Sequence, residues 1–184
     1  MDENVVIGFA GLPGAGKSTA IEAVKPLGDV ITMGDVVRNE VKKNGLQINP
    51  ETLGKTARDL RRTHGPNIIA EKCVAWIKDS KCKIAFVDGI RSMNEVNIFR
   101  QVWTFPIVAI ICPRELRHDR LRNRGRSDDS LDLEAIRKRD EREIGFGLKK
   151  VLENADIKIE NTGSKQFLKQ RTQEAVKKLI ADLK

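Results

Sequence analysis

The chain has 184 residues and a net charge of +8, with 33% charged and 40% hydrophobic residues. This balance suits one globular domain and excludes a disordered chain. The apolar run near the start is too short for a signal peptide or a membrane span, so we expect a cytoplasmic protein. The charge attracts anions, including nucleotides and RNA. With 4% aromatic residues and no tyrosine, single-stranded nucleic acid is a disfavoured partner.

A phosphate-binding loop follows the first apolar run, at residues 5–10. The next octet reads G-L-P-G-A-G-K-S and lies between a predicted strand and a predicted helix, as such a loop requires. Its glycines let backbone N–H groups turn toward an anion, and the helix start adds its positive dipole end. The lysine suits the β- and γ-phosphates and the serine suits Mg²⁺. A chance glycine-rich turn is the alternative. We predict that ATP and Mg²⁺ bind to Gly11, Pro13, Gly14, Ala15, Gly16, Lys17, Ser18 and Thr19.

Apolar, β-branched runs recur along the chain and alternate with helical patterns. Strands that alternate with helices predict an α/β fold, with a parallel sheet covered by helices on both faces. The expected strands cover 5–10, 30–33, 84–87, 107–112 and 157–159.

Residues that are typical of helix starts and helix ends support this alternation. Asn49-Pro50 predicts an N-cap followed by proline at the first helical position, and Ser92 to Glu95 read as a capping box. A further helix is expected from Pro113 to Gly125. The last helix, over 164–183, is expected to pack an apolar stripe of Phe167, Leu168, Ala175, Val176, Leu179, Ile180 and Leu183 on the core.

Cysteines and histidines show no metal-binding spacing. Cys73, Cys82 and Cys112 lie far apart, and two of them, Cys73 and Cys112, fit as small buried thiols. His64 and His118 are flanked by charged residues, so we expect both at the surface.

Two acidic residues follow predicted strands. Asp88 ends the third strand, where a Walker B carboxylate holds Mg²⁺ beside a phosphate loop; Ser18 and Asp88 are therefore the metal candidates. The alternative is an Asp that caps the next turn. Asp35 and Arg38 share one face of a helix start after the second strand. Arg38 would clamp a second phosphate-bearing molecule and Asp35 would position or deprotonate its hydroxyl, unless they are simply an N-cap and a surface arginine.

Arginines are densest between the fourth and fifth predicted strands. Such a segment can close over ATP, stabilise the charge of the transferred phosphoryl group and exclude water. The alternative, a solvated basic helix face, holds for most of these side chains, because only two or three can reach a substrate. The arginines are Arg114, Arg117, Arg120, Arg122, Arg124 and Arg126, followed by Arg137 and Arg139.

Four short segments resemble the nucleoside monophosphate kinases, adenylate kinase above all, and the related dephospho-coenzyme A kinases. G-D-V-V-R at 34–38 is similar to G-D-M-L-R, and D-G-I-R at 88–91 is similar to D-G-F-P-R. R-S-D-D at 126–129 resembles the R-x-D-D of the ATP lid, and N-T-G-S at 161–164 resembles the loop that receives adenine. The chain looks most like a group of archaeal adenylate-kinase-related proteins.

The resemblance implies a P-loop NTPase fold with strand order 2-3-1-4-5. It implies one domain over 1–184, with an acceptor-binding helical segment at about 34–80 and a short lid at about 114–145. Arg38 and Arg91 would hold the acceptor phosphate, and Asn161 and Gly163 would lie near adenine. The lid candidates for ATP and catalysis, beside Lys17 and Asp35, are Arg120, Arg124, Arg126 and Arg137.

The departures from adenylate kinase leave three functions open. D-G-I-R is one residue shorter and lacks the proline, and the short lid is closer to the dephospho-coenzyme A kinases, which lack D-G-I-R. In those enzymes the Asp at the position of Asp35 acts as a base toward a ribose hydroxyl. The first hypothesis is a kinase for a nucleoside monophosphate-like acceptor such as AMP. The alternatives are a dephospho-coenzyme A kinase and a slow ATPase acting as an assembly factor. We expect a monomer or small homo-oligomer.

Overall fold

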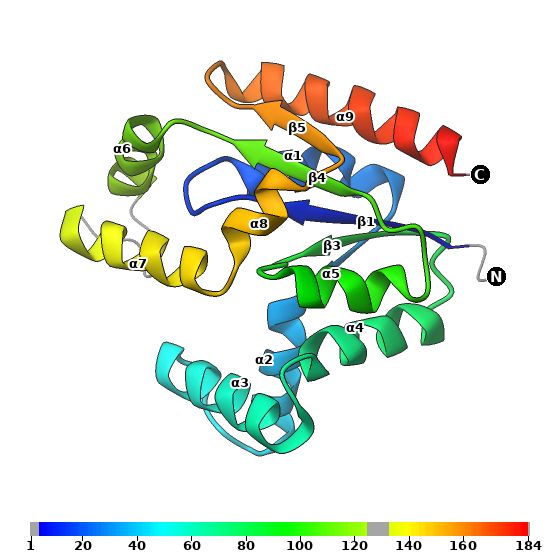
Figure 1. The fold of residues 1–184 in the computed structure, drawn as a ribbon, viewed down its shortest axis with the longest axis vertical. Coiled ribbons are helices and arrows are strands. Elements are labelled where there is room, and N and C mark those ends of the chain that lie inside the picture. Colours follow the sequence, from blue (N-terminus) through cyan, green and yellow to red (C-terminus); the bar gives the residue numbers. More distant parts are fainter. Residues whose placement is uncertain (1–3, 125–132, 184) are drawn as a thin grey trace.

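Parallel strands form a single five-stranded sheet in the order β2-β3-β1-β4-β5. The computed structural model describes residues 4–124 and 133–183 (Figure 1). The order and the α/β class are as predicted. The second strand ends one residue earlier than expected, because Met33 begins the next helix and is buried there. The strands are β1 (Val5–Ala10), β2 (Asp29–Thr32), β3 (Ile84–Asp88), β4 (Ile107–Ile111) and β5 (Ile157–Glu160).

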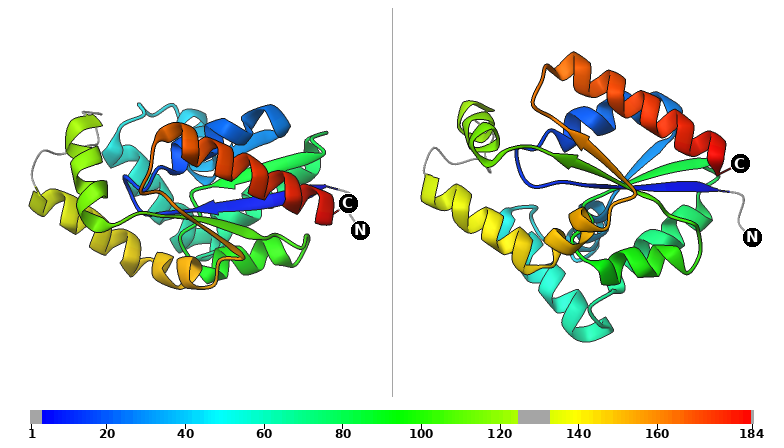
Figure 2. Two further views of the ribbon diagram at one scale, coloured as in Figure 1. Left: turned by 90° about the horizontal axis from the view of Figure 1, so that it is seen from above. Right: turned by 45° about the horizontal axis from the view of Figure 1, so that its top comes forward.

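Helices cover both faces of the sheet (Figure 2). One face carries α1 (Lys17–Val24) and α9 (Lys165–Asp182), and the other carries α4 (Ile68–Asp79), α5 (Met93–Arg100) and α8 (Leu148–Glu153). A 3₁₀ turn, η1 (Lys25–Leu27), follows α1. The remaining helices are α2 (Met33–Lys43), α3 (Pro50–His64), α6 (Arg114–Arg124) and α7 (Leu133–Gly145).

Strand β1 divides the core into two clusters, because successive side chains of a strand point to opposite faces. Val6 and Ala10 pack with the cluster that includes α4 and α5. Val5, Ile7 and Phe9 pack with the cluster under α1 and α9. A strand buried on both faces reads as a continuous apolar run, as this one does.

The predicted helix starts are present, with two differences. Asn49 Oδ1 accepts the Thr52 N–H at 2.9 Å, and Ser92 Oγ accepts the Glu95 N–H at 3.2 Å. The Glu95 carboxylate does not close that capping box; it accepts the Arg91 N–H at 2.8 Å instead. Phe167 is not core packing as expected: it is 53% exposed, because it lies in the first turn of α9 with its ring against Gly163.

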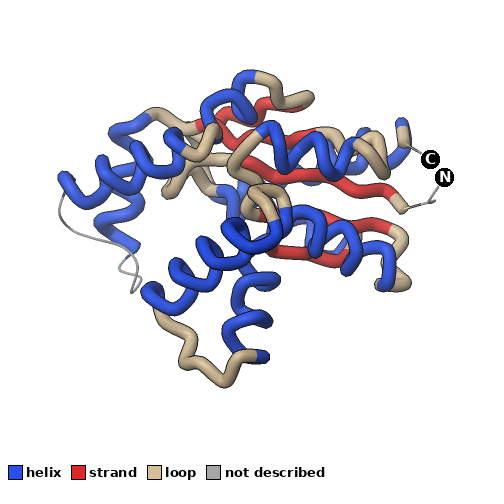
Figure 3. The backbone as a smooth tube through the Cα atoms, turned by 60° about the horizontal axis from the view of Figure 1, so that its bottom comes forward, coloured by secondary structure: helices blue, strands red, loops and turns tan. Residues whose placement is uncertain are grey.

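The carboxyl ends of β1, β2 and β3 meet at one edge of the sheet. Phe9 of β1 and Thr32 of β2 both lie in register with Asp88 of β3. Helices α6 and α7, the described parts of the expected lid, lie toward this edge, and so does α3 of the expected acceptor segment (Figure 1), whereas α4, which ends that segment, packs on a face of the sheet. Helices α2 and α3 form an arm that projects from the sheet (Figure 3). Over 4–124 and 133–183, no helix has both the length and the apolar character needed to cross a membrane.

Candidate functional site

The phosphate loop connects β1 to the start of α1. Gly14 and Gly16 have φ of 77° and 104°, in the left-handed region that favours glycine. Gly16 is also the N-cap of α1, so the first turn of the helix directs its unpaired N–H groups toward the loop. The geometry is that of an anion-binding helix start.

Two buried side chains hold carbonyl groups of this loop. Arg117 Nη1 donates to the Pro13 oxygen at 2.9 Å, and Asn161 Nδ2 donates to the Ala15 oxygen at 2.8 Å. Both residues are about 95% buried, with exposures of 4% and 5%. The Pro13 and Ala15 carbonyls are therefore satisfied by protein groups.

Lys17 and Asp88 meet at the centre of the site, where the Lys17 ammonium forms an ion pair with the Asp88 carboxylate. Ser18, the other metal candidate, lines the adjacent cavity. Among the described residues no cluster of three or more His, Cys, Asp or Glu can hold a metal ion. Mg²⁺ needs no such cluster, because it binds through one or two protein oxygens together with water and phosphate. The Ser18 hydroxyl and the Asp88 carboxylate are oxygen donors, so the residues present fit Mg²⁺.

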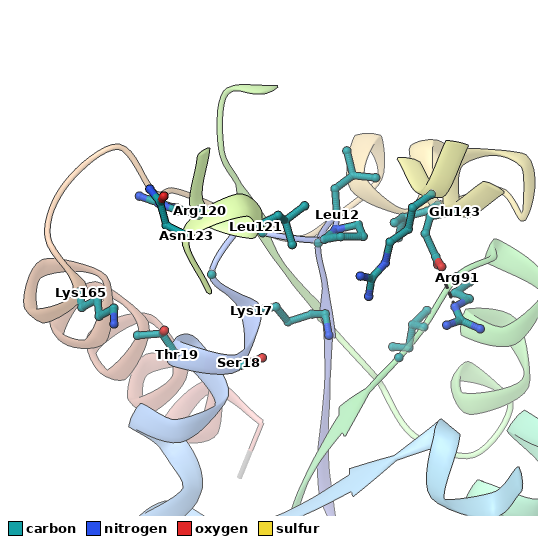
Figure 4. Close-up of a pocket in the computed structure, with 18 residues that line it drawn as sticks. Leu12, Lys17, Ser18, Thr19, Arg91, Arg120, Leu121, Asn123, Glu143 and Lys165 are labelled. Carbon is teal, nitrogen blue, oxygen red and sulfur yellow. Dashed lines mark ion pairs between the residues drawn. The ribbon is translucent and has the colours of Figure 1, made fainter. Parts of the chain in front are cut away.

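A cavity of about 650 Å³ opens over the loop. In Figure 4, Arg120 and Asn123 lie on one side of Lys17. Arg91 and Glu143 lie on the other side. The lining residues are Gly11, Leu12, Pro13, Gly14, Gly16, Lys17, Ser18, Thr19, Gly89, Ile90, Arg91, Arg120, Leu121, Asn123, Arg139, Glu143, Leu148 and Lys165.

Arg120 anchors one end of the cavity. Its Nη2 donates to the Asn161 main-chain oxygen at 3.2 Å and its Nη1 contacts Cys112 Sγ at 3.3 Å. Burial raises the pKa of the Cys112 thiol, and the nearby charges of Arg120 and Arg117 offset part of the rise. The guanidinium is thus held across the ends of β4 and β5. Gly163, expected near adenine, does not line the cavity, whereas Lys165 does.

Arg91 occupies the other end and is fixed by carboxylates. Its Nε lies 2.9 Å from Glu143 Oε2 of α7, and its guanidinium lies over the Phe146 ring, 5.7 Å from the centroid. The main-chain N–H of Arg91 donates to the buried Glu95 carboxylate, which also lies 3.9 Å from Arg61. Burial raises the pKa of Glu95, partly offset by that N–H and by the arginine charges. Burial also lowers the pKa of Arg61, so desolvation outweighs this ion pair.

Asp35 and Arg38 lie outside the cavity lining and pair with each other. Arg38 Nη1 donates to Asp35 Oδ1 at 2.6 Å, and both side chains are nearly half exposed. Arg137 is exposed and does not line the cavity, whereas Arg139, two residues further along α7, does. The backbone of Arg124 ends α6, and Arg126 lies outside the described residues.

A buried charge cluster joins α6 to α7. Arg117 makes two hydrogen bonds to the Asp140 carboxylate, of 2.9 and 2.8 Å, and His118 Nε2 lies 3.2 Å from the same group. Burial by itself would raise the pKa of Asp140, but Arg117 and His118 hold that pKa below its ordinary value. The expectation that His118 lies at the surface is wrong: it is 7% exposed.

Sequence reasoning missed this cluster and part of the cavity wall. Arg117 stands in a run of arginines, and no periodicity distinguishes it from its exposed neighbours. Asp140 and Glu143 belong to a strongly charged helix, and only their spacing of three, which places them on one face, hints at a shared role. The signal for Lys165 is Ser164, the N-cap of α9, which places Lys165 at the first position of that helix.

Comparison with known proteins identifies the relatives of this chain. Residues 10–137 match the model of an AAA domain family, AAA_17. The chain is 41% identical to a UPF0200/UPF0201 protein of Archaeoglobus fulgidus over 98% of its own length, but it spans only 58% of that relative. It is 38% identical to a UPF0200 protein of Methanosarcina barkeri, over 89% of this chain and 90% of the relative.

Solved structures share the fold at low sequence identity. TT1252 from Thermus thermophilus superposes with a TM-score of 0.64 and 18% identity, covering 98% of both chains. A shikimate kinase from Acinetobacter baumannii has a TM-score of 0.58 and 15% identity, over 98% of this chain and 96% of that one. A dephospho-CoA kinase from Campylobacter jejuni also has a TM-score of 0.58, with 21% identity over 96% and 98%. The chain belongs to the UPF0200 family and has a P-loop kinase-like fold.

Proposed function

We propose that the protein is an ATP- and Mg²⁺-dependent phosphotransferase whose acceptor is a nucleoside monophosphate-like molecule, with AMP as the best candidate. The observation that carries this proposal is the continuity of one cavity from the phosphate loop to Arg91. A simple ATPase needs only the loop and water. A cavity that continues to a second cation at the end of β3 provides room for a second phosphate-bearing molecule.

The loop end of the cavity suits the donor nucleotide. Loop N–H groups, the start of α1 and the Lys17 ammonium would bind the β- and γ-phosphates, while Arg120 would lie beside the nucleotide with Asn123 and Lys165 nearby. Ser18 and Asp88 would hold Mg²⁺, which when bound neutralises charge on the phosphate oxygens.

The Arg91 end suits the acceptor phosphate. That phosphate would replace Glu143 as the partner of the Arg91 guanidinium, and Arg38 would contact it if the α2–α3 arm approached. An oxygen of the acceptor phosphate attacks the γ-phosphorus of ATP, the bond to the β–γ bridging oxygen breaks, and ADP leaves. Lys17 and the arginines of α6 and α7 stabilise the charge, and catalysis is mainly positioning.

The decisive experiment measures ADP release from ATP and Mg²⁺ with AMP, CMP, UMP, GMP, dephospho-coenzyme A or no acceptor, with Lys17→Ala as the control. We expect strong stimulation by AMP, and isotopically labelled AMP should appear as labelled ADP by mass spectrometry. Stimulation by dephospho-coenzyme A alone would replace the acceptor in this proposal. Slow release that no acceptor changes, and that Lys17→Ala abolishes, would favour an ATPase.

Arginine variants test where the acceptor binds. Arg91→Ala should raise the KM for AMP about tenfold or more, since a charge-assisted hydrogen bond contributes about 1.5–3 kcal/mol. Arg38→Ala should do the same if the arm closes on the acceptor. Arg62→Ala is the matched control, because Arg62 is 80% exposed on α3, pairs at 3.1 Å with Asp59 of the same helix and does not line the cavity. An unchanged KM in Arg91→Ala would remove Arg91 from the acceptor site.

A further inference from the structure

The buried side of the phosphate loop contains a contact that phosphate binding itself does not require. Arg117 Nη1 lies 2.9 Å from the Pro13 oxygen, yet Arg117 does not appear among the described residues that line the cavity. It is 4% exposed and contacts the loop from the side of α6. In this arrangement Arg117 acts on a bound phosphate only through the loop backbone.

Because a peptide bond is rigid, the contact between Arg117 and the Pro13 oxygen also orients the next N–H donor of the loop. The Pro13–Gly14 peptide is planar and trans, so its C=O and N–H point in opposite directions. With the Pro13 oxygen held toward Arg117, the Gly14 N–H faces away from α6, toward the cavity that Gly14 lines. The same logic holds two residues later, where Asn161 fixes the Ala15 oxygen and so directs the Gly16 N–H.

Arg117 is in turn positioned by the lid helix α7. Asp140 accepts two hydrogen bonds from Arg117, at 2.9 and 2.8 Å, and both side chains are at least nine-tenths buried. A guanidinium held by a bidentate carboxylate has a defined plane. Its donor to Pro13 is therefore correctly aimed only while Asp140, and with it α7, packs against α6.

We infer that Arg117 is a positioning residue, held by Asp140, which orients the Pro13–Gly14 peptide to bind nucleotide phosphate and makes that orientation depend on the docking of α7. This inference rests on the proposed nucleotide site but not on the identity of the acceptor. The close packing of the elements supports it: a side chain at Gly14 would place its Cβ 2.6 Å from the Arg117 oxygen. Loop and helix are thus in direct contact.

Binding of ADP tests the inference without a turnover assay. Asp140→Asn keeps the side-chain shape but removes the charge that holds Arg117. In Arg117→Lys a single ammonium replaces the planar guanidinium, so it cannot hold the Asp140 carboxylate and the Pro13 oxygen in the same fixed geometry. We expect each to weaken ADP binding about tenfold by calorimetry, the scale of one charge-assisted hydrogen bond. Asp119→Asn is the matched control, because Asp119 is 66% exposed on α6, the helix of Arg117, and lies 3.9 Å from Arg122; this variant should bind ADP as the wild type does.

The Gly14 amide provides a readout that a merely structural role would not change. In ¹H–¹⁵N spectra of the wild type, ADP should shift the Gly14 amide proton strongly downfield, and in Asp140→Asn and Arg117→Lys that shift should be much smaller. Melting curves establish that each variant is folded at the temperature used. If Asp140→Asn does not fold, Asp140→Glu, which keeps the charge but displaces the guanidinium, is expected to give the same loss.

The outcomes separate the two proposals. Wild-type ADP affinity or a wild-type Gly14 shift in folded Asp140 and Arg117 variants would overturn the positioning role and leave the kinase proposal intact. Absence of ADP binding by the wild type would overturn both. Tight ADP binding without stimulation by any acceptor would overturn only the kinase proposal.

Discussion

Replacement of Asp88 by asparagine should have opposite effects on ATP binding with and without Mg²⁺. Lys17 and Asp88 form an ion pair whose side chains are 24% and 20% exposed. In the proposed function the phosphates of ATP would have to compete with Asp88 for Lys17, while Mg²⁺ would use the same carboxylate as a ligand. Asp88→Asn removes the competitor and the ligand together and keeps the side-chain size.

The partial exposure of this pair limits the effect. An ion pair that water reaches contributes about 1 kcal/mol at most, so in EDTA the Kd for ATP should fall up to about fivefold. Removal of a carboxylate next to the phosphates acts in the same direction. In Mg²⁺ the variant should lose most of the gain in affinity that the metal gives the wild type.

Calorimetry of ATP binding in EDTA and in MgCl₂ checks both effects, with Ser18→Ala as the matched control. That variant keeps the Lys17–Asp88 pair, so it should lose part of the Mg²⁺ gain and bind as the wild type does in EDTA. If Asp88→Asn binds ATP in EDTA no more tightly than the wild type, Asp88 does not compete for Lys17. If it keeps the full Mg²⁺ gain, Asp88 is not a metal ligand.

Three further measurements test individual buried groups. Asn161→Ala leaves the buried Ala15 carbonyl unpaired and should cost about 1–3 kcal/mol of unfolding free energy. Asn154→Ala, which loses an exposed 2.8 Å hydrogen bond to the Lys150 carbonyl, should cost less. Equal losses of stability in urea unfolding would contradict this. Glu95 has a raised pKa, so stability present below its unfolded pKa is lost as pH rises through the folded pKa; Glu95→Gln should remove that loss, and a stability difference from the wild type that is constant with pH would refute it. Burial raises the pKa of Cys73 to about 12, so iodoacetamide at pH 8 should leave Cys73 unmodified while it alkylates the more exposed Cys82, as peptide mass spectrometry will show.

Local sequence patterns predicted the strands, the helix caps and the phosphate loop, because each of these depends on a few neighbouring residues. The strand β4 is an uninterrupted apolar run, Asn49 and Ser92 each cap a helix by bonding to an N–H three residues ahead, and the glycine loop has its two left-handed positions at Gly14 and Gly16. The strand order followed from the resemblance to known kinases. Phe167 was misplaced because periodicity does not show how far a helix extends beyond the sheet.

The buried charge cluster lay beyond the reach of such patterns. Arg117 and His118 look like solvated residues in a helix whose other arginines are mostly exposed. Their burial depends on Asp140, which lies on another helix and neutralises Arg117 only after both helices have packed. A charged side chain is usually buried only when it has a partner of opposite charge. Here the tertiary structure supplies that partner, and the local sequence does not show it. Roles at the acceptor end, for Asp35, Arg38 and Arg91, stay predictions for the same reason.

The pairing of the site's cations indicates where the affinity for phosphate arises. Lys17, Arg38 and Arg91 each contact a carboxylate, Asp88, Asp35 and Glu143 respectively. A phosphate that binds one of these cations replaces an existing anionic partner, so its net gain is smaller than it would be at an unpaired cation. Among the described residues no carboxylate bonds to the N–H groups of the loop, so a phosphate that binds there displaces no anion. Nucleotide affinity should therefore depend strongly on how the loop peptides are oriented, and Arg117 and Asn161, which do not line the cavity, hold two of the loop carbonyls.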